Sequence, residues 1–218
     1  MTDLAPSSAP SKPDLCIVGR PSSHFTRVAR LFAEELGLDY QFDLVRDLMS
    51  CDTSDYAGNP ALRLPVLKTG DAAWFGALPI CRELARRGAR PLRIVWPEHL
   101  EQPLLANAQE LTLQGMATEV SLIMGSLGGA AEATPHPVKM RISLTNTVLW
   151  LDAALPDVLA ALPAERDLSF LEVTLFCFVE HLAFREVLPV EGYRHLVDFC
   201  AAFRARPSAA KTPYRFQT

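Results

Sequence analysis

Residues 14–87 constrain the fold most, because apolar strands and amphipathic helices alternate there in a fixed order. Residues 14–18 are an apolar run of strand length, followed by turn residues. A helix is predicted from His24, with Arg27 and the other charged residues mostly away from an apolar stripe of Phe25, Val28, Phe32 and Leu36. Gly37 suits the left-handed position that ends a helix, and residues 40–45 alternate as a strand does. These patterns predict a strand–helix–strand unit with parallel strands.

A hairpin and a second helix are predicted next. The turn residues TGD at 69–71 separate two short strands, so residues 65–68 and 72–75 are expected to pair antiparallel. Residues 78–87 are expected to form a helix that stops at Gly88. A strand–helix–strand unit joined to a hairpin and a helix makes a compact α/β domain.

Beyond residue 90 the pattern changes. Prolines at 91, 97 and 103 mark a linker, and no later segment has the periodicity of a strand. Long helices are predicted at 104–127 and 138–162, a further helix begins at Ser169, and a last one covers about 192–204. Ser169 and Glu172 have the spacing of a capping box. We therefore expect four regions: a disordered tail at 1–13, an α/β domain at 14–90, a linker at 91–103 and an all-helical domain at 104–218.

Charge and cysteine content exclude several kinds of function. The formal charge of −4 gives no general attraction to nucleic acid or to an anionic membrane. Five cysteines without paired spacing argue against a disulfide framework or a structural zinc site, and for a reducing compartment. The first 13 residues lack the apolar block of a signal peptide, and no apolar run is long enough to span a bilayer. We expect a cytoplasmic protein with no metal and no nucleic-acid or membrane partner.

Three places in the first domain are candidates for a binding site. The turn RPSSH at 20–24 joins a strand to a helix, where open α/β sheets bind ligands, although Ser22 or Ser23 alternatively caps the helix. Leu64-Pro65 begins a strand, either as an ordinary edge proline or with a cis bond that turns the backbone groups of Leu64 outward. Residues 76–78 open a helix, whose free N–H groups and positive dipole favour a carboxylate.

Together these segments resemble the cytosolic glutathione transferases. The run LCIVGRPSSHFTRVARLFAEELGLDY, then NPALRLPVL and a helix ending ICREL, are similar to the thioredoxin-like domain of that family. The stretch SFLE at 169–172 resembles the capping box of its second domain, and AAFRARPSAAKTP resembles its last helix and tail. The resemblance covers nearly the whole chain from about residue 14. It implies a thioredoxin-like α/β domain followed by an all-helical bundle.

The resemblance also implies a glutathione site. In the serine-using classes a hydroxyl at the first strand–helix turn donates to the glutathione sulfur. Counting back from Gly37 matches this serine to Ser23, with Ser22 as the neighbouring candidate. Leu64 before Pro65 matches the residue whose backbone pairs with the cysteinyl part.

Further residues are matched less closely. Arg63 falls where a side chain often meets the glycyl carboxylate, or is simply an exposed arginine. A small apolar electrophile would lie between the domains, near His24, Met116 and Met124, unless the methionines belong to the core.

One pair departs from the family pattern. Where the family has an acid and a serine for the γ-glutamyl end, this chain has Gly76 and Ala77. Loss of two charge-assisted contacts costs roughly 3–6 kcal/mol, or about 10²–10⁴ in affinity. The N–H groups of Gly76, Ala77 and Leu78 remain to hold the carboxylate, and a partner subunit in the expected homodimer would have to supply an acid for the ammonium. We expect weakened binding of glutathione, not abolition.

The resemblance leaves more than one function open. The first is a detoxifying glutathione transferase that uses glutathione as co-substrate to conjugate a small electrophile. The second is a transferase-like binding or interaction module without catalysis, which the Gly76-Ala77 pair favours. The third is a glutathione-dependent isomerase. Ser22-Ser23 followed by Arg27-Val28 is similar to the class that isomerises maleylacetoacetate, but the cysteine that follows the two serines in that class is missing.

Overall fold

The apolar run that opens the described chain forms an inner strand of the sheet. The computed structural model of the protein describes residues 14–129 and 134–216, so the tail expected at 1–13 lies outside the described residues. The four-stranded sheet has the order β2-β1-β3-β4. Its strands are β1 (Leu15–Gly19), β2 (Gln41–Leu44), β3 (Val66–Thr69) and β4 (Ala72–Phe75). β1 pairs in parallel with β2 and antiparallel with β3, and all five of its residues are buried.

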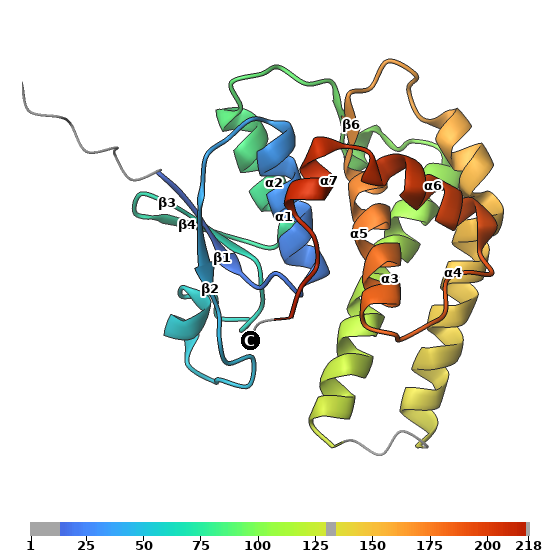
Figure 1. Ribbon diagram of the computed structural model, residues 1–218, viewed down its shortest axis with the longest axis horizontal. Coiled ribbons are helices and arrows are strands. Elements are labelled where there is room, and N and C mark those ends of the chain that lie inside the picture. Colours follow the sequence, from blue (N-terminus) through green and yellow to red (C-terminus); the bar gives the residue numbers. More distant parts are fainter. Residues whose placement is uncertain (1–13, 130–133, 217–218) are drawn as a thin grey trace, which may run out of the picture.

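Two helices cover the side of the sheet that faces the rest of the molecule (Figure 1). They are α1 (His24–Glu35) and α2 (Ala77–Arg87). Apolar residues of both helices and of the inner strands form one core, with Phe32, Ile17, Leu67 and Ile80 fully buried. The predicted order of strands and helices in this thioredoxin-like domain is confirmed.

The second part of the described chain is mainly helical, as predicted. Its helices are α3 (Pro103–Leu127), α4 (Pro135–Ala161), α5 (Phe170–Phe184), α6 (Arg194–Arg204) and α7 (Pro207–Lys211). α3 and α4 lie side by side, and α5 lies between them and α1 (Figure 1). α5 is apolar on nearly all sides and is almost wholly buried, as expected of a helix with neighbours all round. None of the described helices is long and apolar enough to cross a membrane.

Three details of this half correct the sequence-based expectations. β5 (Ile94–Val95) and β6 (Leu168–Ser169) form a two-stranded parallel ladder, although no strand was predicted beyond residue 90. Ser169 does accept a hydrogen bond from the N–H of Glu172, at 3.5 Å. The Glu172 carboxylate, however, pairs with Arg166 at 2.7 Å instead of closing the capping box. The helix predicted at about 192–204 is not the last one, because Pro207 starts the short helix α7.

Arg27 is buried although it lies away from the apolar stripe predicted for α1. Only 4% of it is exposed. Its guanidinium carbon lies 4.7 Å from the ring centre of Phe176 and 4.3 Å from that of Tyr214. The reason is that α5 and the chain after α7 cover the side of α1 that faces away from the sheet.

Candidate functional site

A large open cavity lies where the β1–α1 turn, the loop before β3 and the start of α2 face the second half of α3. Its volume is about 1340 Å³. From the first domain it is lined, among others, by Ser22, Ser23, Arg63, Leu64, Pro65, Gly76 and Ala77. The opposite wall includes Ile123 and Met124 of α3 and Arg185 at the end of α5. The folding of the sheet thus brings together residues that are widely separated in the sequence.

The two serines occupy different roles in the turn. Ser23 is the N-cap of α1, where its Oγ accepts a hydrogen bond from the N–H of Thr26 at 3.3 Å. Capping uses only the acceptor side of the hydroxyl, so its proton remains available to a ligand. The carbonyl of Ser22 is held from the other domain, because Nε2 of His181 lies 2.9 Å from it. Both serines are half-buried.

The loop before β3 presents the next predicted segment. The Leu64-Pro65 peptide bond is cis, and both residues line the cavity. The amide of Asn59 donates to the carbonyl of Arg63 at 2.8 Å, which fixes the loop just before the proline. The side chain of Arg63 is exposed and lines the same cavity.

The start of α2 has a backbone that suits glycine. Gly76 has φ +82° and ψ 152° and gives the helix no side-chain cap. L side chains rarely adopt this conformation, so an acidic residue at 76 would require the backbone to change. Ala77 is buried and lines the cavity, whereas Leu78 is not among the lining residues. The N–H groups of this first turn have no partner within the helix.

The expected electrophile residues lie in different places. His24 is 1% exposed and contributes to the cavity wall. Met116 is fully buried and does not line the cavity. Its backbone carbonyl accepts a hydrogen bond from Nε2 of His24 at 3.1 Å. Met124, two helical turns further along α3, is the methionine of that helix that lines the cavity.

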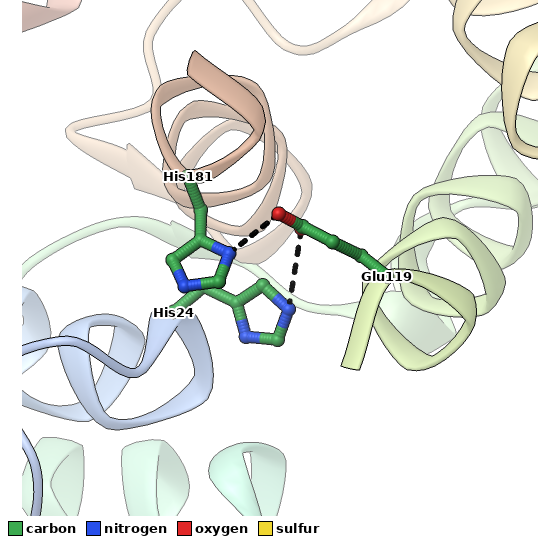
Figure 2. Close-up of side chains that lie close together, drawn as sticks. All are labelled: His24, Glu119 and His181. Carbon is green, nitrogen blue, oxygen red and sulfur yellow. Dashed lines mark hydrogen bonds and ion pairs between the residues drawn. The ribbon is translucent and has the colours of Figure 1, made fainter. Parts of the chain in front are cut away.

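Sequence reasoning missed a buried cluster behind the serine turn. Figure 2 shows His24 of α1, Glu119 of α3 and His181 of α5 pointing toward one another. Nδ1 of His181 lies 2.7 Å from Oε1 of Glu119, and Nε2 of His24 lies 3.6 Å from Oε2. The imidazole ring centres of the two histidines are 4.4 Å apart. Their spacing in the chain gives no motif; the only signal was a polar residue within each of two strongly apolar helices.

The hydrogen bonds determine which ring nitrogens of the two histidines carry a proton. The N–H of Phe25 donates to Nδ1 of His24 at 2.8 Å, so the proton of the neutral ring is on Nε2 and is donated to the carbonyl of Met116. Nε2 of His181 donates to the carbonyl of Ser22, because a carbonyl only accepts. Nδ1 of His181 and Glu119 therefore share a single proton. Within the described part of the chain, Oε2 of Glu119 has no hydrogen-bond partner.

Burial controls the electrostatics of the cluster. Burial lowers the pKa of His24 well below its ordinary value; the charge of His181 acts in the same direction and the Met116 carbonyl opposes it. Burial raises the pKa of Glu119, against the hydrogen bond and charge of His181. His24 is therefore uncharged near neutral pH.

This cluster is a poor fit for a metal ion. Its ligand atoms lie within 4.8 Å of one another, as those of a metal site do. The nitrogen that His24 would offer carries a proton, however, because its other nitrogen accepts from the backbone of Phe25. Metal binding would have to remove that proton and the bond to Met116. The cluster instead acts as a hydrogen-bonded link between α3, α5 and the serine turn.

A sequence-family model matches part of the first domain. Residues 22–87 match the sequence-family model described as glutathione S-transferase, N-terminal domain. A search of curated protein sequences finds no significant match.

Solved structures resemble nearly the whole chain. A glutathione S-transferase from Methylobacillus flagellatus KT with glutathione bound has a TM-score of 0.72 at 18% identity, over 92% of this chain and 100% of that one. One from Methylobacterium radiotolerans, in complex with glutathione sulfonate, has a TM-score of 0.72 at 17% identity, over 94% and 97%. A family member from Pseudomonas fluorescens Pf-5 with bound S-(propanoic acid)-glutathione has a TM-score of 0.70 at 15% identity, over 92% and 100%. Residues 22–87 therefore match the glutathione S-transferase N-terminal domain family, and nearly the whole chain has the fold of the glutathione S-transferases.

Proposed function

We propose that the protein binds glutathione in the cavity and transfers its thiolate to a small electrophile held between the domains. The observation that carries this proposal is the convergence of Ser23, the cis Leu64-Pro65 bond and the start of α2 on one cavity. Structural relatives with bound glutathione or glutathione derivatives support the choice of ligand.

Ser23 is the residue proposed to favour the thiolate. A free thiol has a pKa of about 8.5, and lowering it by about two units requires roughly 2.7 kcal/mol. One or two hydrogen bonds to a charged acceptor supply about 1.5–3 kcal/mol each. The Ser23 hydroxyl can donate one while its oxygen caps α1. The sulfur then attacks the electrophilic carbon, and the leaving group departs with its bonding electrons.

The remaining parts of glutathione are assigned to backbone groups and one arginine. The N–H groups of Ala77 and Leu78 are proposed to hold the γ-glutamyl carboxylate, and Arg63 the glycyl carboxylate. Gly76 provides no acid for the ammonium, so we expect weak binding unless a second subunit of a homodimer contributes one. Five free cysteines support a reducing, cytoplasmic location, and detoxification of electrophiles is the proposed role.

The second candidate function is a binding or interaction module without catalysis. Gly76 favours it, because glycine has no carboxylate for the ammonium and an acid at φ +82° would be strained. This function predicts glutathione binding without turnover.

A conjugation assay separates these two functions. We expect glutathione and chlorodinitrobenzene to react faster with the wild-type protein present. Ser23→Ala should lower kcat/KM about 10- to 100-fold, the value of one hydrogen bond to a thiolate. Ser22→Ala, which keeps the carbonyl that His181 holds, is the matched control and should change little. Unchanged turnover in Ser23→Ala would remove this residue from its role, and an inactive wild type that still binds glutathione would favour the module.

A further inference from the structure

The cavity has a positive lining in a protein whose formal charge is −4. Among the residues that the structure describes, five arginines but only two acidic residues line it. A cleft lined by one sign of charge concentrates ligands of the opposite sign. Elsewhere, arginines such as Arg93, Arg166 and Arg206 form ion pairs with carboxylates. Arg20 and Arg185 of the cavity require a separate explanation.

Two of them approach each other from opposite domains. His181 contacts the carbonyl of Ser22, two residues after Arg20. Arg185 follows His181 by one helical turn, and its N–H donates to the His181 carbonyl at 2.8 Å. Residues four apart lie on the same face of a helix, so Arg185 faces the turn that carries Arg20. Both side chains line the cavity.

Neither guanidinium has an acidic partner within ion-pairing distance in residues 14–129 and 134–216. Nη1 of Arg20 donates to the carbonyl of Arg46 at 3.1 Å, and its buried Nε has no hydrogen-bond partner. Arg185 lies 5.2 Å from the ring centre of Phe216. Burial lowers the pKa of Arg185; the carboxylate of Glu119 opposes this, and the charge of Arg20 lowers it further. Two partly buried like charges in one cavity repel each other, and a bound anion relieves that repulsion.

We propose that Arg20 and Arg185 bind the carboxylate of the second substrate, so that the electrophile is an organic acid and not a neutral compound. This inference rests on the proposed transferase function and names its substrate class. Guanidinium groups match a carboxylate through paired N–H donors, which suits a small acid held between the turn and the end of α5. Glutathione's own carboxylates are assigned elsewhere, at the start of α2 and at Arg63.

A matched pair of electrophiles tests the proposal. The probes are a chloronitrobenzoate and the corresponding chloronitrobenzamide, which differ in charge and undergo the same substitution, so each rate is divided by that of the same probe without enzyme. In both, the thiolate attacks the carbon that carries chlorine, the C–S bond forms, the C–Cl bond breaks and chloride leaves with the electron pair. We expect the wild type to prefer the benzoate. Arg185→Gln and Arg20→Gln should each lower kcat/KM for the benzoate about 10-fold or more and that for the benzamide less than about 2-fold.

Arg46→Gln is the matched control, because its exposed side chain lines the same cavity and only its carbonyl contacts Arg20. It should leave the benzoate preference within about 2-fold. Equal losses for both electrophiles, or an equal loss in Arg46→Gln, would overturn the proposal. So would a matching loss of glutathione affinity, since the arginines would then serve glutathione itself.

Binding of the finished conjugates gives a readout that needs no turnover. Calorimetric titration with the S-linked carboxyphenyl and carboxamidophenyl conjugates of glutathione should show tighter binding of the acid, and the difference should disappear in Arg185→Gln. A wild type without conjugating activity that still prefers the acid conjugate would refute the transferase function while supporting the anion site. Equal affinity for the two conjugates would refute the anion site.

Discussion

Replacing Glu119 by leucine removes the group that shares a proton with His181. Glu119 is 0% exposed and His181 is 3% exposed, so water cannot replace the lost partner. Removing one member of a buried, charge-assisted pair costs about 3–5 kcal/mol. Leucine has a similar volume, so a cavity contributes little to this loss. We expect Glu119→Leu to lower the free energy of unfolding by that amount.

Glu119→Gln is the matched control. The amide can donate to Nδ1 of a neutral His181, whose Nε2 still donates to the carbonyl of Ser22. The shape is unchanged and every ring nitrogen keeps a partner. We therefore expect Glu119→Gln to cost about 1 kcal/mol.

Urea unfolding followed by circular dichroism measures these values for the wild type, Glu119→Leu, Glu119→Gln, His181→Leu and the double leucine variant. The double variant leaves no unpaired member of the pair, so its loss should be smaller than the sum of the single losses by about 2–3 kcal/mol. Losses that add within about 0.5 kcal/mol, or equal losses for leucine and glutamine at position 119, would refute the shared-proton description.

Three further predictions concern single residues. The folded chain keeps His24 neutral because its pKa is lowered, while the unfolded chain takes up a proton near pH 6.5. The neutral His24 therefore contributes fully to the free energy of unfolding above about pH 6.5. This contribution is lost as the pH falls toward the lowered pKa, by up to about 1.4 kcal/mol per pH unit. His24→Gln should therefore flatten the fall in unfolding free energy between about pH 7 and about pH 5, as measured by urea unfolding; an unchanged slope would contradict this. A Cβ at Gly115 would lie 2.5 Å from Cζ of Phe178, so Gly115→Ala should cost about 1–3 kcal/mol in thermal unfolding, and a raised Tm would contradict this packing. Ala77→Ser should tighten glutathione binding about 10-fold by adding a hydroxyl donor at the start of α2; an unchanged Kd would place the γ-glutamyl carboxylate elsewhere.

The fold of the first domain could be predicted because its signals are local. Each strand and helix there has its own periodicity, and glycines or turn residues separate them. β5 and β6 could not be predicted, because two residues carry no periodicity and their pairing joins segments far apart in the chain. The burial of Arg27 was not predicted, because an amphipathic pattern indicates one buried face, while α1 is covered by both the sheet and α5 (Figure 1).

The parts of the candidate site that lie in turns could be predicted from the sequence. The parts that lie on helices could not, because their position depends on how each helix is rotated. The serine turn, the proline before β3 and the start of α2 are marked in the sequence and meet at one cavity. Which methionine of α3 reaches that cavity depends on how the helix is rotated, and Met116 faces inward. Glu119 and His181 come from separate helices, so only packing brings them to the serine turn.

Calorimetric titration of the protein with glutathione at neutral pH tests the central claim most directly. We predict saturable binding with a Kd of roughly millimolar order or somewhat tighter, reflecting backbone contacts at α2 without the usual acid. Ser23→Ala should retain most of this binding, because the serine is proposed to act on the thiolate and not to hold the peptide. The absence of a saturable heat at millimolar glutathione would contradict the proposal that this cavity is a glutathione site.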